Sequence, residues 1–287
     1  MMGALWMLLS ALLFGCMGVL VKIGAAHFSS GELVFYRSLF SFLFIGAMLA
    51  RSGTGLATPH WRGHMWRGLS GTVAMMLFFY CISVLPLATA ITLNYTSALF
   101  LAALTVIVAR EKLHLPLGAV LALGFLGVVL LLRPTLAQAQ LGIGLLGLLS
   151  GLLAGVAIFN VRQMGQQGES ALRIVFYFNL TAVAGSGAWM VGAGTYAGTL
   201  HAPAISDLPL LVAIGASATL AQLAMTHAYR IGHTLAISSL SYSTIAFATL
   251  FDWLFWQRAL PLAAWLGMLL IIASGVVSLR LSPALER

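Results

Sequence analysis

The segment at residues 234–255 carries a regular stripe of polar side chains through an otherwise apolar stretch. Ser238, Ser241, Tyr242, Thr249 and Asp252 recur near i, i+3, i+4, i+11 and i+14, which places them on one face of a helix. Hydroxyl and phenol groups in such a stripe can bind a polar solute through hydrogen bonds. The alternative for serine and threonine is a hydrogen bond to a carbonyl of their own helix, which is common.

Further polar side chains stand at comparable places in other apolar segments. Asn94 and Tyr95 lie in the segment at 89–109, and Asn160 lies in the segment at 142–162. Tyr80 and His227 stand near the ends of two more segments, where they line either a cavity or an interface with the lipid headgroups. We predict that the substrate is bound by Tyr80, Asn94, Tyr95, Asn160, His227, Ser238, Ser241 and Tyr242, with Lys22 as a further contact.

The few charges inside the apolar segments limit the chemistry further. Lys22 either snorkels toward water or contacts a substrate carboxylate. Arg37 follows Glu32, and we expect an ion pair between them at the end of a helix. Asp252 is the acid placed deepest in an apolar segment. It is therefore the candidate residue for coupling the movement of a solute to that of an ion such as a proton. A cation exporter needs a carboxylate within the membrane, so these residues favour neutral or zwitterionic solutes.

An intramembrane serine protease is the alternative to a protein that binds and moves a solute. Gly68-Leu69-Ser70-Gly71 resembles a GxSG motif, and Ser70 with His227 as its base would be the catalytic pair. The string arises easily in a chain with 30 glycines. Nucleotide-binding and metal motifs are absent, and Cys16 and Cys81 define neither a disulfide framework nor a metal cluster. We therefore expect a protein that is not an enzyme and needs no cofactor or metal.

The composition shows which elements must position these residues. The chain has 287 residues, of which 61% are hydrophobic and only 7% are charged, whereas a soluble domain carries about 25% charged residues. A soluble enzyme is excluded, because so few charges cannot cover a surface in water. Ten apolar segments approach the roughly 20 residues of a membrane span: 3–25, 32–50, 67–85, 89–109, 116–132, 142–162, 171–192, 208–229, 234–255 and 261–280.

Basic residues set the expected orientation. With the N-terminus in the cytoplasm, the outer loops contain only Arg133 and Arg258, and the remaining loop Lys and Arg residues face inward. This asymmetry is the positive-inside pattern, so both termini are predicted to be cytoplasmic. The net charge of +8 then reflects membrane topology, and we expect no nucleic-acid partner.

The chain repeats itself weakly but in constant order. Residues 5–15 (LWMLLSALLFG) align with residues 145–155 (LLGLLSGLLAG), which pairs Ser10 with Ser150. Further on, Tyr95 aligns with Tyr242, and Tyr80 falls opposite His227. Each half holds five segments, and an odd number inverts the second half in the membrane. We predict an all-α membrane protein of ten transmembrane helices, in two inverted repeats at 1–134 and 135–287 around a central cavity.

The series Ala88, Tyr95 and Glu111-Lys112-Leu113, followed by a glycine-rich segment, resembles the EamA-type transporters of the drug/metabolite transporter superfamily. The resemblance covers essentially the whole chain. It implies a secondary transporter of the bacterial inner membrane that exports small molecules by alternating access. A monomer in the lipid bilayer is the expected state, although the sequence itself does not determine the oligomeric state. The chain is similar to the branch that exports aromatic and other neutral amino acids; export of other metabolites or drug-like solutes is the alternative.

Overall fold

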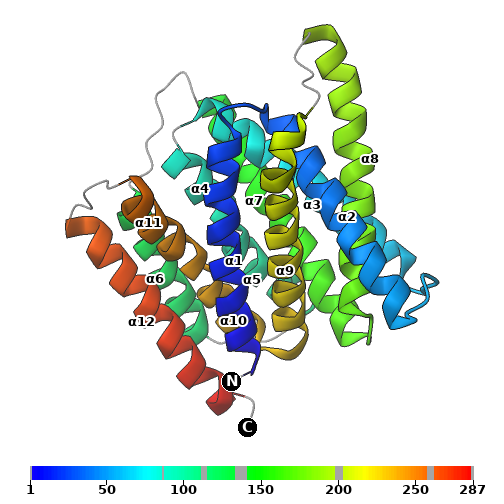
Figure 1. Cartoon of the computed structure of the whole chain (residues 1–287). Helices are drawn as coiled ribbons and strands as arrows, with labels where there is room; N and C mark the ends of the chain where they lie inside the picture. The colour runs from blue at the N-terminus through cyan, green and yellow to red at the C-terminus, as the bar shows by residue number, and fades with distance from the viewer. Residues whose placement is uncertain are drawn as a thin grey trace.

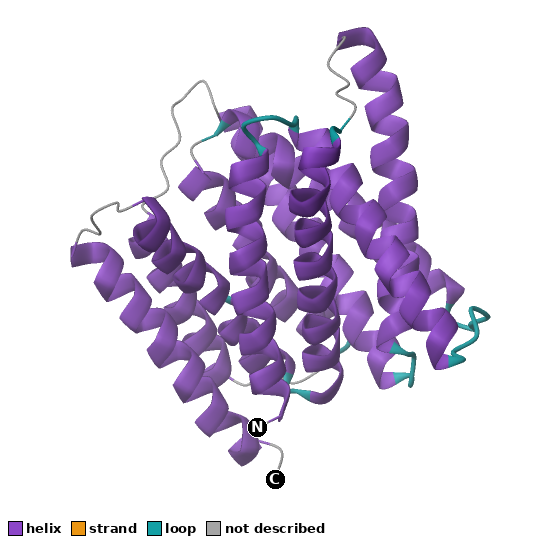
Figure 2. Cartoon of the chain, in the orientation of Figure 1, coloured by secondary structure: helices purple, strands orange, loops and turns teal. Residues whose placement is uncertain are grey.

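The computed structural model describes residues 2–85, 87–110, 115–132, 141–197, 203–256 and 262–285. These residues form α-helices joined by short loops, with one 3-10 helix and no strand in the part described (Figure 2). The helices are α1 (Met2–Gly24), α2 (Ser30–Ser52), α3 (Trp61–Val84), α4 (Leu87–Tyr95), α5 (Ser97–Ile107), α6 (Leu115–Leu132), α7 (Leu141–Gln166), α8 (Ala171–Ala197), η2 (Ile205–Asp207), α9 (Leu208–Ile231), α10 (Thr234–Ser241), α11 (Ser243–Trp256) and α12 (Leu262–Leu285).

The chain is a multi-pass membrane protein. Six stretches have the length and hydropathy to cross a bilayer: Met2–Gly24, Gly31–Ser52, Leu141–Gln166, Ala171–Gly192, Ile205–Ile231 and Thr234–Phe255. The predicted all-α membrane class is therefore confirmed. Two of the ten segments expected from the sequence are interrupted: 89–109 forms α4 and α5, and 234–255 forms α10 and α11.

The helices pack in a pattern that relates the two halves. α1 lies along α9 and against α11, just as α7 lies along α3 and against α5. α6 packs on α12 at one side of the bundle, and α2 packs on α8 at the other (Figure 1). Each helix of the first half thus has its main neighbours in the second half, so the halves interlock instead of forming separate bodies.

Matching hydrogen bonds hold the two central helix pairs together. The Ser10 hydroxyl of α1 donates to the Ala221 carbonyl of α9 at 2.8 Å, and the Ser150 hydroxyl of α7 donates to the Ala74 carbonyl of α3 at 2.9 Å. Ser10 and Ser150 are the residues that the sequence repeat pairs, and both are fully buried. Two aligned serines therefore perform the same packing task in the two halves.

A row of glycines lets α7 approach the interrupted α4–α5 segment closely. Gly147, Gly151 and Gly155 recur every four residues, on one face of α7. A Cβ at Gly151 would lie 2.6 Å from the Leu93 carbonyl oxygen, and one at Gly155 would lie 3.1 Å from the Ser97 carbonyl oxygen. Only glycine fits here, because the backbones of α7 and of α4–α5 are almost in contact.

Local signals explain where α2 begins and ends. Ser29 and Glu32 form a reciprocal capping box at its N-terminus, with the Glu32 carboxylate accepting the Ser29 amide at 2.8 Å. At the other end Gly53 adopts a left-handed conformation with φ of 65°, which glycine tolerates without steric cost. The Glu32 carboxylate is therefore occupied at the helix terminus.

Candidate functional site

The two interrupted apolar segments, α4–α5 and α10–α11, break at corresponding places in the chain, and neither break contains a proline. The helix is interrupted at Thr96 between α4 and α5 and at Tyr242 between α10 and α11. At the first break the Thr96 hydroxyl donates to the Leu93 carbonyl at 2.5 Å, and at the second the Ser241 hydroxyl donates to the Ser238 carbonyl at 2.7 Å. In both cases a side-chain hydroxyl donates a hydrogen bond to the backbone carbonyl three residues earlier, and such bonds bend helices.

Three tyrosines gather where these breaks meet, and we call Tyr95, Tyr229 and Tyr242 the tyrosine cluster. The Tyr95 and Tyr242 ring centroids are 6.3 Å apart at an interplanar angle of 46°. The Tyr229 hydroxyl lies 3.4 Å from the Ser238 hydroxyl. Ser238 is fully buried, and Ser241 is half-buried beside it. The cluster thus joins α4, α9 and α10 with phenol and hydroxyl groups.

Tyr242 has the least expected environment in the cluster. It is 0% exposed, and its hydroxyl has no hydrogen-bond partner among the described residues. Phe125 of α6 lies 6.3 Å from it, centroid to centroid, and a Cβ at Gly124 would lie 2.9 Å from its ring. The Tyr242 phenol therefore lacks a hydrogen-bond partner among the described residues, and such a group costs free energy unless something else satisfies it.

Asn94 and Asn160 are placed away from one another. The Asn94 amide donates to the Ser150 hydroxyl at 2.9 Å, so it extends the α7–α3 hydrogen bond described above. The Asn160 amide donates to the Val156 carbonyl of its own helix at 2.8 Å. Asn160 lines a separate pocket of about 540 Å³ between α3 and α7, with Pro59, His60, Trp61, Arg62, Gly63, Trp66, Gln163, Met164 and Gln167.

Three further predicted residues, His227, Tyr80 and Lys22, have surroundings of their own. His227 packs edge-on against Trp6, with ring centroids 5.1 Å apart. Tyr80 is 47% exposed, and Lys22 is half-buried in the last turn of α1. The side chain of Asp252 and all of Glu111 lie outside the described residues. The structure therefore brings together Tyr95, Ser238, Ser241 and Tyr242. Among the described side chains, those of Asn94, Asn160 and His227 have their contacts elsewhere.

Sequence reasoning missed Tyr229, which completes the cluster. Tyr229 is 2% exposed and stands two residues after His227, the residue we selected on that segment. A signal was present in the sequence: Gln222, Thr226 and Tyr229 recur at i, i+4 and i+7, so they share one face of α9. All three are buried in the structure.

Arg37 is not paired with Glu32, so that expectation is wrong. The Arg37 side chain is 5% exposed and turns inward, where it donates to the Met75 sulfur at 2.7 Å and to the Gln222 amide oxygen at 3.4 Å. Residues five apart on a helix lie on different faces, which explains why the acid and the base do not meet. The sequence distance between Met75 and Gln222 equals that between Tyr95 and Tyr242. The repeat that aligns the two tyrosines therefore also aligns Met75 with Gln222.

Arg67 is a second buried cation. It is 4% exposed, and its guanidinium lies 3.9 Å from the centroid of the Phe178 ring. Arg67 also interacts electrostatically with Arg37. The Nε atom of each arginine is buried without a partner, and no described carboxylate pairs with either residue. Two desolvated cations thus lie between α2, α3, α8 and α9.

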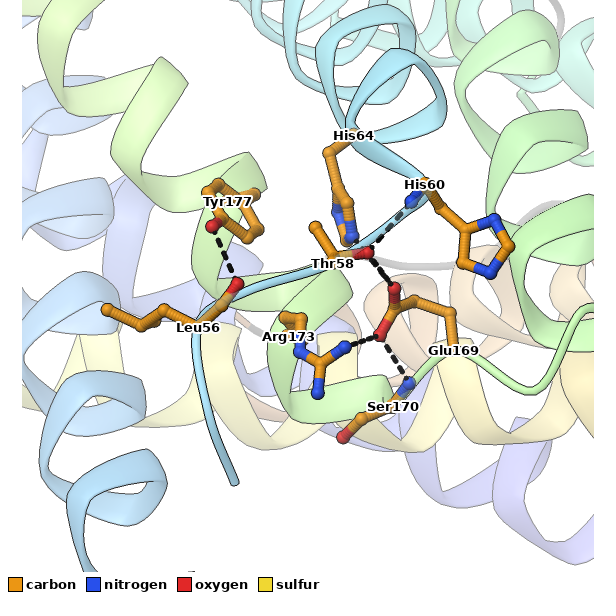
Figure 3. A network of polar contacts seen from close by, with 8 residues as sticks. All are labelled: Leu56, Thr58, His60, His64, Glu169, Ser170, Arg173 and Tyr177. Carbon is orange, nitrogen blue, oxygen red and sulfur yellow. Dashed lines mark hydrogen bonds and ion pairs between the residues drawn. The ribbon is translucent and has the colours of Figure 1, made fainter. Parts of the chain in front are cut away.

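A polar network ties the α2–α3 loop to the α7–α8 loop (Figure 3). The Glu169 carboxylate accepts hydrogen bonds from Thr58, from the Ser170 amide at 2.9 Å and from Arg173 at 2.7 Å, and it lies 3.3 Å from His64 Nε2. Burial alone raises the pKa of Glu169, but these hydrogen bonds and the Arg173 charge outweigh burial and lower it. The network therefore fastens together loops from different halves.

The residues of the protease reading are engaged elsewhere. The Ser70 hydroxyl donates to the Trp66 carbonyl of its own helix, and His227 packs on Trp6. A Cβ at Gly68 would collide with Thr181 of α8, so this glycine serves helix packing. No group of metal-ligating side chains occurs among the described residues. Helix packing therefore accounts for Gly68, and a local hydrogen bond accounts for Ser70.

Comparison with known proteins finds transporters among the relatives of this chain. Residues 1–133 match the EamA-like transporter family, which confirms the resemblance found in the sequence. An uncharacterized transporter of Helicobacter pylori is 29% identical over 96% of this chain and 93% of its own length. The pseudopaline exporter CntI of Pseudomonas aeruginosa is 27% identical over 94% of each chain, and a riboflavin transporter of Rhizobium johnstonii is 26% identical over 99% and 93%.

A solved crystal structure shares the fold over nearly the whole chain. Its TM-score is 0.80, with 99% of each chain covered at 20% sequence identity. At that identity the likeness concerns the fold alone. The match extends through both halves, including the second, which lies beyond the residues matched by the family.

Proposed function

We propose that this chain, as an EamA-type transporter of the drug/metabolite transporter superfamily, exports small molecules across a bacterial inner membrane. The exported molecules are amino acids or related small metabolites. Aromatic and neutral amino acids are the favoured substrates. Ten spans form two inverted repeats at residues 1–134 and 135–287, with both termini in the cytoplasm. The named transporter relatives cover both halves of the chain, which supports one activity for the whole molecule.

The observation that carries the proposal is the tyrosine cluster at the junction of the two interrupted spans. In secondary transporters, broken helices at corresponding places in the two halves mark the substrate site near the midplane. Here the breaks at Thr96 and Tyr242 meet beside the Tyr95–Tyr242 ring pair. The buried Tyr242 hydroxyl supplies a donor that has no partner among the described residues, and a polar solute would use it.

Alternating access follows from the equivalence of the halves. Ser10 with Ala221 and Ser150 with Ala74 form the same contact in each half. Because equivalent interfaces have similar energies, exchanging the conformations of the halves interconverts inward-open and outward-open states at little cost. The Glu169 network joins two loops on one face of the bundle. Its hydrogen bonds would therefore have to break when the transporter opens toward that face.

The chemistry of the cluster selects the substrate class. Phenol and hydroxyl groups with aromatic rings suit a solute that has an apolar side chain and a few polar groups. A permanent dication would find no described carboxylate beside the cluster. Other metabolites or drug-like solutes remain the second candidate, since the relatives are named for pseudopaline and riboflavin.

The test is counterflow in proteoliposomes loaded with a panel of unlabelled amino acids, with and without a pH gradient. Saturable uptake of labelled neutral or aromatic amino acids would support the proposal. Dependence on the pH gradient would add proton coupling and direct attention to Asp252. Robust transport of dications or riboflavin with none of amino acids would overturn the substrate class.

A further inference from the structure

The charge balance around Arg37 and Arg67 is incomplete. Arg37 contacts the Met75 sulfur and the Gln222 amide oxygen, and Arg67 contacts the Phe178 ring. None of these partners carries a negative charge. Burying an arginine inside a membrane protein is expensive, and such residues normally pair with an acid or serve a functional pathway. Here a second cation lies nearby, which makes burial more costly still.

Neither arginine uses the ordinary escape from burial. Long basic side chains near helix ends snorkel to the interface, but Arg37 and Arg67 are 5% and 4% exposed. The Nε atom of each is buried and makes no hydrogen bond to any residue that the structure describes. The two residues come from α2 and α3, and their neighbours Gln222 and Phe178 come from α9 and α8. Four helices thus bring positive charge and free donors to one place.

The placement of Arg37 relates it to both halves. Its guanidinium bonds at the same time to Met75 of α3 and Gln222 of α9, which occupy equivalent positions in the repeat. A group held between equivalent positions can keep a ligand while the halves exchange conformations. This is the position expected of a residue that binds a transported solute.

One face of α9 connects the arginines to the tyrosine cluster. Gln222 bonds Arg37, and Tyr229 belongs to the cluster. These two residues lie seven positions apart, about 10 Å along the helix axis. Thr226 stands between them on the same face and is fully buried, and no described residue bonds its hydroxyl. A continuous polar stripe therefore leads from two cations to three phenols.

We propose that Arg37 and Arg67 bind the carboxylate group of the transported solute, whose apolar portion is directed along α9 toward the tyrosine cluster. The proposal rests on the proposed export function and adds its chemical class: the substrates are carboxylates. A guanidinium matches a carboxylate in geometry through paired N–H donors, which an ammonium does not. The arginines thereby gain the negative charge that the described residues do not supply.

The test compares phenylalanine with phenylalaninamide, which lacks the carboxylate. The first readout is the thermal unfolding of the purified protein in detergent. Phenylalanine should raise Tm and the amide should not. Arg37→Gln and Arg67→Gln should weaken phenylalanine binding roughly 10- to 100-fold, as expected for hydrogen bonds to a charged group. Arg51→Gln is the matched control, because Arg51 is exposed at the end of α2.

Arg37→Lys controls for a general loss of folding in Arg37→Gln. It keeps the positive charge but removes the paired N–H donors of the guanidinium. It should retain the preference for phenylalanine over the amide with weaker binding. Equal stabilisation by both compounds, or an Arg37→Gln protein that folds and still prefers phenylalanine, would overturn the proposal. The second readout is counterflow. Equal counterflow of both compounds would overturn the carboxylate site and leave the transporter intact. Selective binding of phenylalanine without any counterflow would overturn export and support the site.

Discussion

The Tyr242 ring lies 6.3 Å from the Tyr95 ring, while the Tyr242 hydroxyl is buried and has no hydrogen-bond partner in the described part of the chain. An unsatisfied buried hydroxyl costs about 1–3 kcal/mol. Tyr242→Phe removes that cost and keeps the ring contacts with Tyr95 and Phe125. We expect the variant to be as stable as the wild type or about 1 kcal/mol more stable. Thermal unfolding without substrate checks this, and a clear loss of stability would show that the hydroxyl has a structural partner.

The close approach of α7 to the interrupted span predicts a position-specific glycine effect. Gly151→Ala places a Cβ 2.6 Å from the Leu93 carbonyl oxygen, so a helix must shift. We expect a loss of about 1–3 kcal/mol in stability. Gly18→Ala is the matched control, since nothing lies within 4 Å of its Cβ position in α1. Equal thermal stability of the two variants would contradict the packing described here.

The Glu169 network predicts a pH dependence with a definite sign. The pKa of Glu169 is lowered below its ordinary value of 4.5. Its contribution to folding is therefore complete above the unfolded-state pKa and is lost as the pH falls through the folded-state pKa. Stability should decline on acidification below about pH 5, and Glu169→Gln should flatten that decline. Unfolding curves from pH 7 to pH 4 provide the test, and parallel curves for both proteins would exclude this role.

The protease reading gives a prediction of its own. The Ser70 hydroxyl bonds a carbonyl of its own helix, so Ser70→Ala should leave transport within about twofold of the wild type. A reactive probe for serine hydrolases should not label the protein at Ser70. Labelling that disappears in Ser70→Ala would instead support an enzyme.

Some features could be predicted from the sequence because they depend on local pattern. The length of the apolar runs gave the helices, and the offset between aligned residues led to the Tyr95–Tyr242 pair. Ser10 and Ser150, aligned only as identical letters, form matching hydrogen bonds. Local signals could not reveal the helix breaks, since they contain no proline and arise from single hydroxyl-to-carbonyl bonds.

Other features depend on tertiary contacts that spacing does not encode. The partners of Arg37 come from α3 and α9, whereas Glu32 is nearby in sequence only. Glu169 meets Thr58 and His64 from a distant loop, and nothing in either segment signals the other. Tyr229 could be found only from its helical spacing with Gln222 and Thr226, which places all three on one face of α9. Positions set by packing between the halves are therefore those that the sequence analysis missed.

The most direct test of the central claim is counterflow of a labelled aromatic amino acid in proteoliposomes containing wild-type protein or Tyr242→Phe. Both proteins should be equally well folded, and saturable counterflow by the wild type is expected. The variant should lose roughly tenfold or more in initial rate, since a hydrogen bond to the solute is removed from a buried site. Equal rates in the two proteins would contradict a substrate site at the tyrosine cluster.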